Sequence, residues 1–388
     1  MNRFRDLLLS LLVAMVALSS CRKEEEIIPS SRVRVGVPGR PGKIKGFFLL
    51  NEANMGSNKA TLDYYDYTTA FYTRNIYAER NPNVVKELGD VGNDLQIHGS
   101  RLYAVINVSG LIEVMDVRTA KHIGKLSIPN CRYIAFKDGF AYVSSYAGPV
   151  KIDPNARLGY VAKVDTATLK VVAECPVGYQ PEELLIHGDK LYVANSGGYR
   201  APNYDKTISI IDLKTFTEEK QVDVAINLHR LQLDNYGKIW ASSRGDYKDV
   251  PSQLFVFDPK TERVTKTLEV GCSNMALSGD SLFVYSSEWS YLTGKNTISY
   301  TVIDTKKQEV IDRNFIKDGT DKEIQLPYGL AINSEQGELY LTDAQDYVHP
   351  GQLHCYDLKT GRRKWSVKTG DIPAHIAFTT QPLHPLHH

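Results

Sequence analysis

The segment ISIIDLKTFT, residues 208–217, decides the fold of this chain. An alternating apolar strand leads into Asp212, and a second β-rich stretch follows Thr215. The same Asp-x-x-Thr signature begins at Asp66, Asp116, Asp165, Asp212, Asp258 and Asp357, with a near variant at Asp304. Neighbouring copies lie 46 to 53 residues apart, and a period of this size indicates stacked supersecondary units.

The repeated aspartates are interpreted as clamps of tight turns. An Asp carboxylate accepts hydrogen bonds from backbone N–H groups two residues further along the chain, and a Thr hydroxyl does so more weakly. A catalytic role for all of these aspartates would require seven equivalent active sites. The signature therefore predicts hairpins that each join two strands.

A second repeated element precedes each signature and consists of a short strand, a Gly-containing turn and a strand bearing Tyr or Phe. Six copies occupy residues 95–107, 134–144, 184–195, 231–242, 275–286 and 330–342. The seventh copy is split, because residues 46–51 supply its second strand and residues 376–379 its first. With four strands per unit, the pattern predicts an all-β fold, a closed seven-bladed β-propeller with four-stranded blades whose last blade joins both termini.

Composition agrees with a single β-rich domain over residues 44–380, followed by a tail at 381–388. Apolar residues make up 42% of the 388 residues, and 23 Tyr stand against 5 Met, which suits half-buried strands. The tail contains His384, His387 and His388, for which we expect no metal site beyond adventitious binding.

The first residues have the features of an export signal. Arg3 and Arg5 precede an apolar core at residues 7–18, which is too short to span about 30 Å of hydrocarbon as a helix. The sequence Leu18-Ser19-Ser20-Cys21 resembles the bacterial lipobox. This resemblance implies a signal peptide at 1–20, cleavage before Cys21 and lipidation of its thiol, which would anchor the protein to a membrane. The alternative is an ordinary cleaved signal with an incidental Cys.

Residues 21–43 are expected to form the lipidated Cys and a flexible tether. They are rich in Glu, Pro and Gly, and such a segment cannot bury enough surface to become ordered by itself. The run Lys23-Glu24-Glu25 resembles the export signal of Bacteroidetes surface lipoproteins. That resemblance implies an outer-membrane location exposed at the cell surface. If the charged run is only a solvated spacer, the protein faces the periplasm instead.

Charge and motifs exclude several function classes. Removing residues 1–20 takes away Arg3, Arg5 and Asp6, a net of +1, so the formal charge falls from +1 to zero. A neutral chain without a basic stripe has no electrostatic reason to bind nucleic acid. The sequence contains no His-Glu-x-x-His, Gly-x-Ser-x-Gly, phosphate-loop, dinucleotide or EF-hand motif. We therefore expect a protein that is not an enzyme and uses no cofactor or metal.

The remaining cysteines suggest no metal motif by their spacing. Cys131, Cys175, Cys272 and Cys355 allow three disulfide pairings, between which the sequence cannot choose. We interpret them as small buried hydrophobic residues.

Binding is expected where the repeats differ most. The connections between the second and third strands of the predicted blades are long and unequal, at residues 51–60, 144–158, 195–206, 242–253, 286–296 and 342–352. In a four-stranded blade these connections all emerge on one face. Variable loops on a rigid scaffold commonly carry binding sites.

These loops are rich in aromatic side chains, which offer a large contact area at a low entropy cost. Together they contribute Asn51, Asn54, Tyr146, Tyr199, Arg200, Tyr204, Arg244, Tyr247, Trp289, Tyr291, Tyr347 and His349. The loops that join neighbouring blades add Tyr179 and Tyr328 to the same face.

One further set of candidates comes from aligning the first strands of the repeats. The alignment places Asp94, Tyr133, Glu183, Arg230, Asn274, Gly329 and His375 at one equivalent position. These residues are expected to form a ring around the mouth of the central channel. Tyr133, Arg230 and His375 complete the set of candidate ligand-binding residues. The alternative is that the ring is only the polar lining that a solvated channel requires.

The repeats resemble the YncE-like propellers over essentially everything after residue 43. A lipidated Bacteroidetes chain with seven blades and a loop face rich in Tyr, Asn and Trp is similar to the BtuG-type surface proteins, although no short motif defines that group. The resemblance implies capture of cobalamin (vitamin B12) as a ligand and a TonB-dependent outer-membrane transporter as partner. Stacking aromatics with Asn and Arg donors are what an amide-fringed corrin with a nucleotide tail would require.

Two other functions remain open. A glycan-binding surface lipoprotein would use the same aromatic platforms. A lyase on a similar propeller would need an acid and a base near the axis, for which His375, Glu183 and His349 are the candidates.

Overall fold

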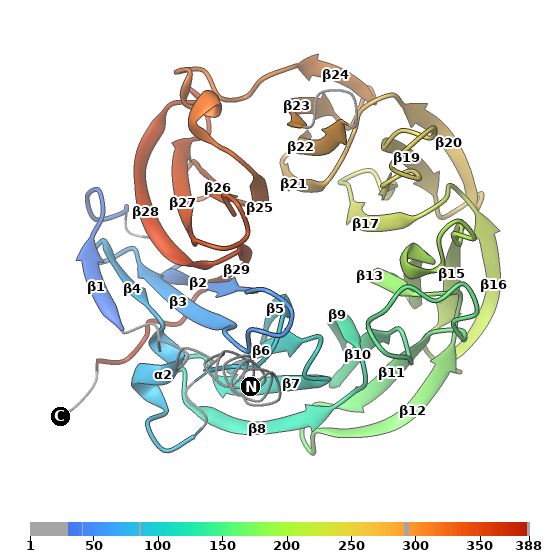
Figure 1. The fold of residues 1–388 in the computed structure, drawn as a ribbon, viewed down its shortest axis with the longest axis horizontal. Coiled ribbons are helices and arrows are strands. Elements are labelled where there is room, and N and C mark those ends of the chain that lie inside the picture. Colours follow the sequence, from blue (N-terminus) through green and yellow to red (C-terminus); the bar gives the residue numbers. More distant parts are fainter. Residues whose placement is uncertain (1–29, 41, 85–86, 291–294, 386–388) are drawn as a thin grey trace, which may run out of the picture.

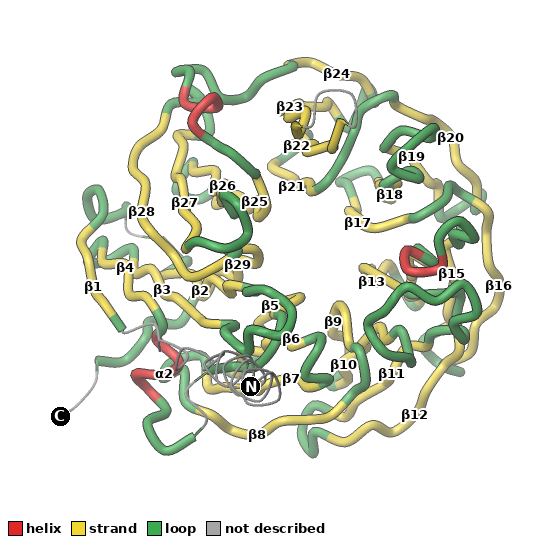
Figure 2. The backbone as a smooth tube through the Cα atoms, viewed as in Figure 1, coloured by secondary structure: helices red, strands yellow, loops and turns green. Residues whose placement is uncertain are grey.

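The computed structural model describes residues 30–40, 42–84, 87–290 and 295–385. Their strands form seven antiparallel sheets, arranged as blades around a central axis (Figure 1). The first strand of each blade lies next to the axis and the last lies at the rim, as the yellow strands of Figure 2 show. The predicted seven-bladed β-propeller is thus confirmed.

The blades are numbered here in chain order. Blade 1 holds β5 (Gly92–His98), β6 (Arg101–Ile106), β7 (Leu111–Asp116) and β8 (His122–Ser127). Blade 2 holds β9 (Cys131–Lys137), β10 (Phe140–Ser145), β11 (Tyr160–Asp165) and β12 (Lys170–Pro176). Blade 3 holds β13 (Pro181–His187), β14 (Lys190–Asn195), β15 (Thr207–Asp212) and β16 (Thr217–Asp223). Blade 4 holds β17 (Leu228–Leu233), β18 (Ile239–Ser243), β19 (Gln253–Asp258) and β20 (Arg263–Leu268).

The second half of the ring follows the same order. Blade 5 holds β21 (Asn274–Ser278), β22 (Ser281–Ser290), β23 (Lys295–Asp304) and β24 (Glu309–Asp312). Blade 6 holds β25 (Pro327–Asn333), β26 (Glu338–Asp343), β27 (Pro350–Asp357) and β28 (Arg363–Asp371). Blade 7 holds β29 (Pro373–Thr379), β2 (Gly46–Asn51), β3 (Thr61–Asp66), β4 (Phe71–Arg74) and β1 (Ser31–Arg34). The described helices are short: α2 (Ile76–Arg80), η1 (Gly198–Arg200) and η2 (Thr320–Glu323).

Blade 7 closes the ring with strands from both ends of the chain. The innermost strand β29 pairs with β2 from Gly46↔Thr379 to Asn51↔Pro373. This is the junction that the split seventh repeat predicts. Closure leaves the chain without a long unpaired strand edge at the joint.

Blade 7 carries a fifth strand, β1, in addition to the predicted four, and this strand comes from the segment 21–43 that was expected to be a flexible tether. β1 pairs with the outer strand β4, although its own side chains are exposed. The segment continues along the blade, since Val35 N donates to Ala70 O at 2.8 Å and Gly39 N to Tyr67 O at 2.7 Å. An edge strand offers unpaired backbone groups, so the segment is ordered without a core of its own. Residues 1–29, with the predicted signal peptide and Cys21, lie outside the described residues.

The hydrophobic core lies between neighbouring blades. One cluster, for example, joins Tyr142 and Val161 of blade 2 to Leu191 and Val193 of blade 3. The four cysteines named above are free and buried, which confirms their interpretation as small apolar residues. The described residues include no helix of the length and apolarity that a membrane span requires.

The aspartates of the repeated signature clamp turns, as predicted. Asp212 Oδ1 accepts hydrogen bonds from Lys214 N at 2.8 Å and Thr215 N at 2.9 Å. Asp357 Oδ1 does the same with the backbone and the hydroxyl of Thr360, both at 2.8 Å. The variant at Asp304 keeps the backbone bond from Lys307 N.

Replacement of a clamp should cost more stability than replacement of an exposed ion pair. We expect Asp212→Ala to lower the free energy of unfolding by about 1 kcal/mol, because two backbone donors lose their acceptor. Asp223→Ala is the control, since Asp223 makes an exposed ion pair with Lys206, and such pairs contribute little. Urea unfolding measures both, and equal losses would contradict the clamp.

Candidate functional site

The two faces of the disc differ in their connections. The turns between first and second strands and the Asp-x-x-Thr turns are short, whereas the connections between second and third strands, at the other end, are mostly long. We call that end the long-loop face. A cavity of about 880 Å³ lies there, and its lining residues come from all seven blades.

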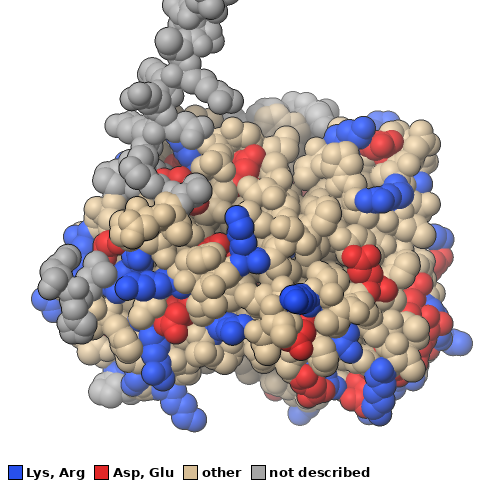
Figure 3. Space-filling model, turned by 90° about the horizontal axis from the view of Figure 1, so that it is seen from below, with Lys and Arg blue, Asp and Glu red and all other residues tan. Residues whose placement is uncertain are grey.

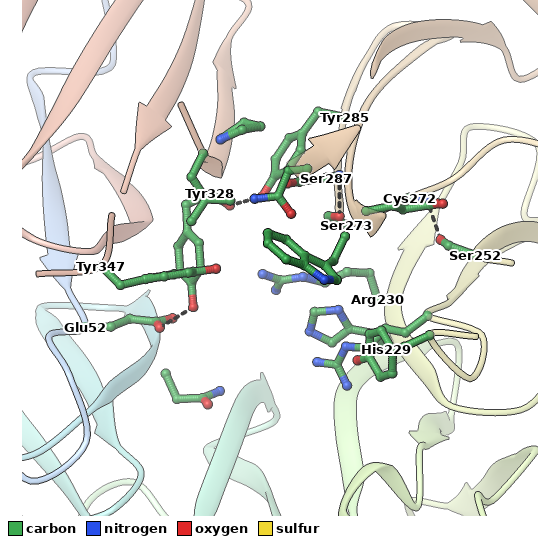
Figure 4. Close-up of a pocket in the computed structure, with 18 of the residues that line it drawn as sticks. Glu52, His229, Arg230, Ser252, Cys272, Ser273, Tyr285, Ser287, Tyr328 and Tyr347 are labelled. Atoms are coloured by element: carbon green, nitrogen blue, oxygen red, sulfur yellow. Dashed lines mark hydrogen bonds between the residues drawn. The ribbon is translucent and has the colours of Figure 1, made fainter. Parts of the chain in front are cut away.

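Eight of the predicted ligand-binding residues in the described part of the chain line this cavity. They are Tyr133, Tyr199, Arg230, Arg244, Tyr247, Trp289, Tyr328 and Tyr347. Figure 4 shows Tyr328, Tyr347 and Glu52 on one side of the cavity, with His229 and Arg230 on the other. The long-loop face therefore gathers side chains that lie far apart in the sequence.

Other predicted residues lie elsewhere. Asn51 is buried within blade 7, where its amide donates to Thr61 Oγ1 at 3.1 Å. The Arg200 guanidinium stacks 3.5 Å from the Tyr179 ring centre, so these two side chains contact each other. Four more, Asn54, Tyr146, Tyr204 and His375, are not among the cavity's lining residues. The buried Tyr146 contacts the lining residues Arg132 and Tyr199.

The described parts of the loop predicted at 286–296 are strand instead. β22 and β23 continue as a ladder up to the pairs Trp289↔Asn296 and Ser290↔Lys295. Trp289 is consequently presented by a strand, with 53% of the residue exposed. Tyr291 lies outside the described residues.

Several lining residues were not predicted from the sequence, and one structural feature explains where they lie. Arg132 and His229 immediately precede the ring residues Tyr133 and Arg230 in the sequence, and both members of each pair line the cavity. In a regular strand, successive side chains point to opposite faces, so only one residue of each pair would face the cavity.

β-Bulges explain why neighbouring residues share a side. The ladder register shifts between Leu228 and Leu231, so His229 and Arg230 have no cross-strand partner. The innermost strands of blades 2, 3 and 6 shift at the equivalent place. A bulge redirects side chains and is common beside functional sites. A second aligned column, one residue before the ring, would have been the signal in the sequence.

A buried carboxylate joins two arginines beneath the cavity floor. Glu182 is 1% exposed at its side chain, and it accepts bonds from Arg132 Nη2 and Arg244 Nη1, each at 3.0 Å. The Tyr146 hydroxyl also donates to it. Burial alone would raise the pKa of Glu182, but the two guanidinium groups outweigh burial and hold that pKa at about 2. The carboxylate is therefore ionised and neutralises one of its two cations.

The adjacent carboxyl behaves in the opposite way. Burial raises the pKa of Glu183 to about 7, and its nearest cation, Arg230 Nη1, is 3.7 Å from Oε1. Its other oxygen accepts from Leu231 N at 2.8 Å, which ties blade 3 to blade 4. Near pH 7, Glu183 therefore compensates Arg230 only in part.

Two further contacts complete the polar walls. His229 Nε2 lies 2.9 Å from the Tyr133 hydroxyl, and burial together with Arg244 and Arg230 lowers the pKa of His229 well below its usual value. Opposite them, Glu52 is held by Tyr328 Oη at 2.6 Å and by His375 Nε2 at 2.8 Å. One side of the cavity is thus cationic and the other carries a carboxylate.

Two rim tyrosines adopt an unusual backbone conformation. Tyr247 and Tyr347 have φ of 62° and 64°, a left-handed region that bulky residues rarely occupy. Each follows an Asp whose Oδ1 accepts from the next backbone N–H groups: Asp246 from three and Asp346 from two. These loops hold both rings at the cavity rim, and Tyr247 is 56% exposed.

Charges elsewhere on the surface are mixed. Figure 3 shows Lys and Arg interspersed with Asp and Glu along the edge of the disc. Among the described residues, no group of three His, Cys, Asp or Glu side chains is placed to hold a metal ion.

Loss of the buried carboxylate should strongly destabilise the fold. We expect Glu182→Gln to lower the free energy of unfolding by about 3 kcal/mol, because two buried guanidinium groups lose their counter-charge. Glu174→Gln, an exposed carboxylate of β12, is the matched control. Thermal unfolding compares the two, and similar midpoints would show that Glu182 is not needed for neutralisation.

Glu183 should make stability depend on pH. Its pKa rises from 4.5 in the unfolded chain to about 7 in the folded one, so the protonated side chain stabilises the fold below about pH 4.5 and this contribution is lost as pH rises through 7. Glu183→Gln, which cannot ionise, should not show this loss of stability between pH 4.5 and 7. Between pH 5 and 8, wild type should lose about 1 to 3 kcal/mol relative to the variant in denaturant unfolding. A pH-independent difference would contradict this assignment.

Comparisons with known proteins support the fold. No curated protein matches the sequence. The chain is similar to the solved structure of hydrazine synthase from Kuenenia stuttgartiensis, with a TM-score of 0.57 and 18% identity over 69% of this chain and 77% of that one. At this identity the likeness shows a shared fold alone. The family described as a domain of unknown function, DUF5074, matches residues 45–379, and the chain therefore belongs to that family.

Proposed function

We propose that this protein captures a bulky polar small molecule, with cobalamin as the first candidate, and catalyses no reaction on it. The observation that carries the proposal is the cavity at the long-loop face, where tyrosines, a tryptophan and arginines converge from different blades. Mixed apolar and directional polar linings are typical of ligand sites. A corrin ring with amide side chains needs both kinds of contact.

The scaffold supports tight binding by being formed in advance. Seven blades fix the cavity walls, so little chain ordering is required when the ligand enters. The rings of Trp289, Tyr247 and Tyr347 remain about half exposed at the rim. Aromatic rings held in this way can stack on a flat ligand without a large loss of side-chain entropy.

The strained tyrosines support a binding role independently. A left-handed backbone costs free energy, and such outliers persist where the surrounding structure enforces them, often at ligand clamps. In both loops the enforcing group is the preceding aspartate. Two blades thus use the same device to present a ring at the cavity.

The candidate acids and bases are engaged in other contacts, which favours binding over catalysis. His375 pairs with Glu52, Glu183 with Arg230, and the exposed His349 with Asp346 at 2.7 Å. A lyase would need an acid and a base aimed at one substrate atom.

We further propose that the protein is lipid-anchored at Cys21 on the cell surface and passes its ligand to a TonB-dependent outer-membrane transporter. The N-terminal end of β1 supports this arrangement. Ser31 pairs with Arg74, at the end of β4 away from the Asp-x-x-Thr turn, so the chain reaches the disc at the long-loop face. Exposed apolar residues on the same rim, among them Met55, Ile152 and Val348, offer a surface for a partner.

Titration with cyanocobalamin tests the proposal. The chain from Ser30 onward should bind it saturably at micromolar concentration or below, observed by calorimetry and by co-elution of visible absorbance in gel filtration. Trp289→Ala and Tyr247→Ala should each weaken binding about 10-fold, as expected for aromatic anchors.

Tyr236→Ala is the matched control, because Tyr236 is exposed on the opposite face, in the turn between β17 and β18. It should leave the affinity unchanged. Absence of heat and of co-eluting colour at micromolar cyanocobalamin would refute the cobalamin assignment. Binding of a polysaccharide under the same conditions would then favour the glycan-binding alternative.

A further inference from the structure

We propose that the cationic wall of the cavity is an oxyanion subsite, formed by Arg230 and Arg244 with His229 beside them. The inference rests on the proposed function in one respect: if cobalamin is the ligand, the oxyanion is the phosphodiester of its nucleotide tail. All three side chains line the same cavity.

The subsite has an excess of positive charge. Among the described residues, Arg132, Arg230 and Arg244 lie near three carboxyl groups, those of Glu182, Glu183 and Asp94. Glu182 is ionised and is shared between Arg132 and Arg244. Glu183 lies 3.7 Å from Arg230, beyond hydrogen-bond distance. Because burial raises the pKa of Glu183 to about 7, this carboxyl carries only part of a negative charge at neutral pH, so the three cations face fewer than three full negative charges and a ligand anion would neutralise the excess.

Two polar atoms of the proposed subsite have no hydrogen-bond partner. Within the part of the chain that the structure describes, Nδ1 of His229 and Nε of Arg230 are buried without a hydrogen-bond partner. Buried polar atoms are nearly always paired, so unpaired atoms at a cavity need an explanation. A ligand oxyanion would anchor the guanidinium of Arg230 and complete the polar contacts of this wall.

The geometry suits an oxyanion better than a neutral group. Arg230 and His229 project from the same bulge of β17 toward the middle of the cavity, as Figure 4 shows. The Arg230 guanidinium carbon lies 5.2 Å from the centre of the Tyr133 ring, which supports its orientation. A guanidinium fork binds phosphate oxygens in pairs and does so more strongly than a neutral donor.

The opposite wall would repel the same group. Glu52 there is held by Tyr328 and His375. An anion on the ligand is therefore directed toward blade 4, and the ligand is expected to enter in one orientation.

A comparison of two corrinoids tests the subsite. Cyanocobalamin carries the phosphodiester, whereas dicyanocobinamide lacks the whole nucleotide tail. Wild type should bind cyanocobalamin at least about 10-fold more tightly, and Arg230→Gln should reduce that ratio about 10-fold, the effect expected from losing a charge-assisted hydrogen bond. Arg230→Lys, which keeps the charge, should retain part of the preference and guards against misfolding of the Gln variant. Arg263→Gln removes one charge from the exposed outer strand β20 and should leave the ratio unchanged.

The outcomes separate this inference from the proposed function. If cyanocobalamin binds and Arg230→Gln leaves the ratio within twofold of wild type, the subsite is refuted and the proposed function stands. If neither corrinoid binds, inorganic phosphate is the probe. Phosphate should then raise the melting temperature of wild type relative to chloride at equal ionic strength, and should not do so for Arg230→Gln. Equal shifts in both proteins would overturn the subsite.

Discussion

The pairing of β29 with β2 is the constraint on which the rest of the molecule depends. It joins residues from the two ends of the chain across six backbone pairs and closes the ring of blades. Once the ring is closed, every blade must bring its first strand to the axis. The N-terminal ends of these strands then meet around the axis at the long-loop face. The cavity is therefore a consequence of closure, and its chemistry is decided by the few residues at the start of each innermost strand.

The bulges at those strand starts divide structural from functional roles. Asp94 and Glu183 reach the next blade, where they accept bonds from Ile134 N at 3.0 Å and Leu231 N at 2.8 Å. Their neighbours in the ring, Tyr133 and Arg230, face the cavity instead. In the polar ring, Asp94 and Glu183 thus hold adjacent blades together, whereas Tyr133 and Arg230 are available to a ligand.

The repeats could be predicted from the sequence because each is a local pattern that recurs. The Asp-x-x-Thr turns and the split blade follow from spacing alone. The pairing of β1 with β4 could not be predicted, because it depends on a free strand edge and not on side-chain pattern. Arg132 and His229 were missed for a related reason: strand alternation predicts one inward residue of every two, and a bulge breaks that rule. Asn51 was misplaced because a polar residue at a strand end can be satisfied inside its own blade.

The asymmetry of the cavity follows from two neighbouring carboxyl groups that lie in different surroundings. Glu182 sits between two guanidinium groups and stays ionised, whereas Glu183 has one cation at 3.7 Å and a pKa of about 7. Exchanging these surroundings would neutralise Arg230 and leave two guanidinium groups, those of Arg132 and Arg244, without a counter-charge, which is more costly than one cation that is compensated in part. The charge excess therefore lies at Arg230, whose side chain lines the cavity. In a fold built from seven similar units, a cationic wall and a carboxylate wall arise only where residues at equivalent positions differ between blades. These differences can orient an asymmetric ligand.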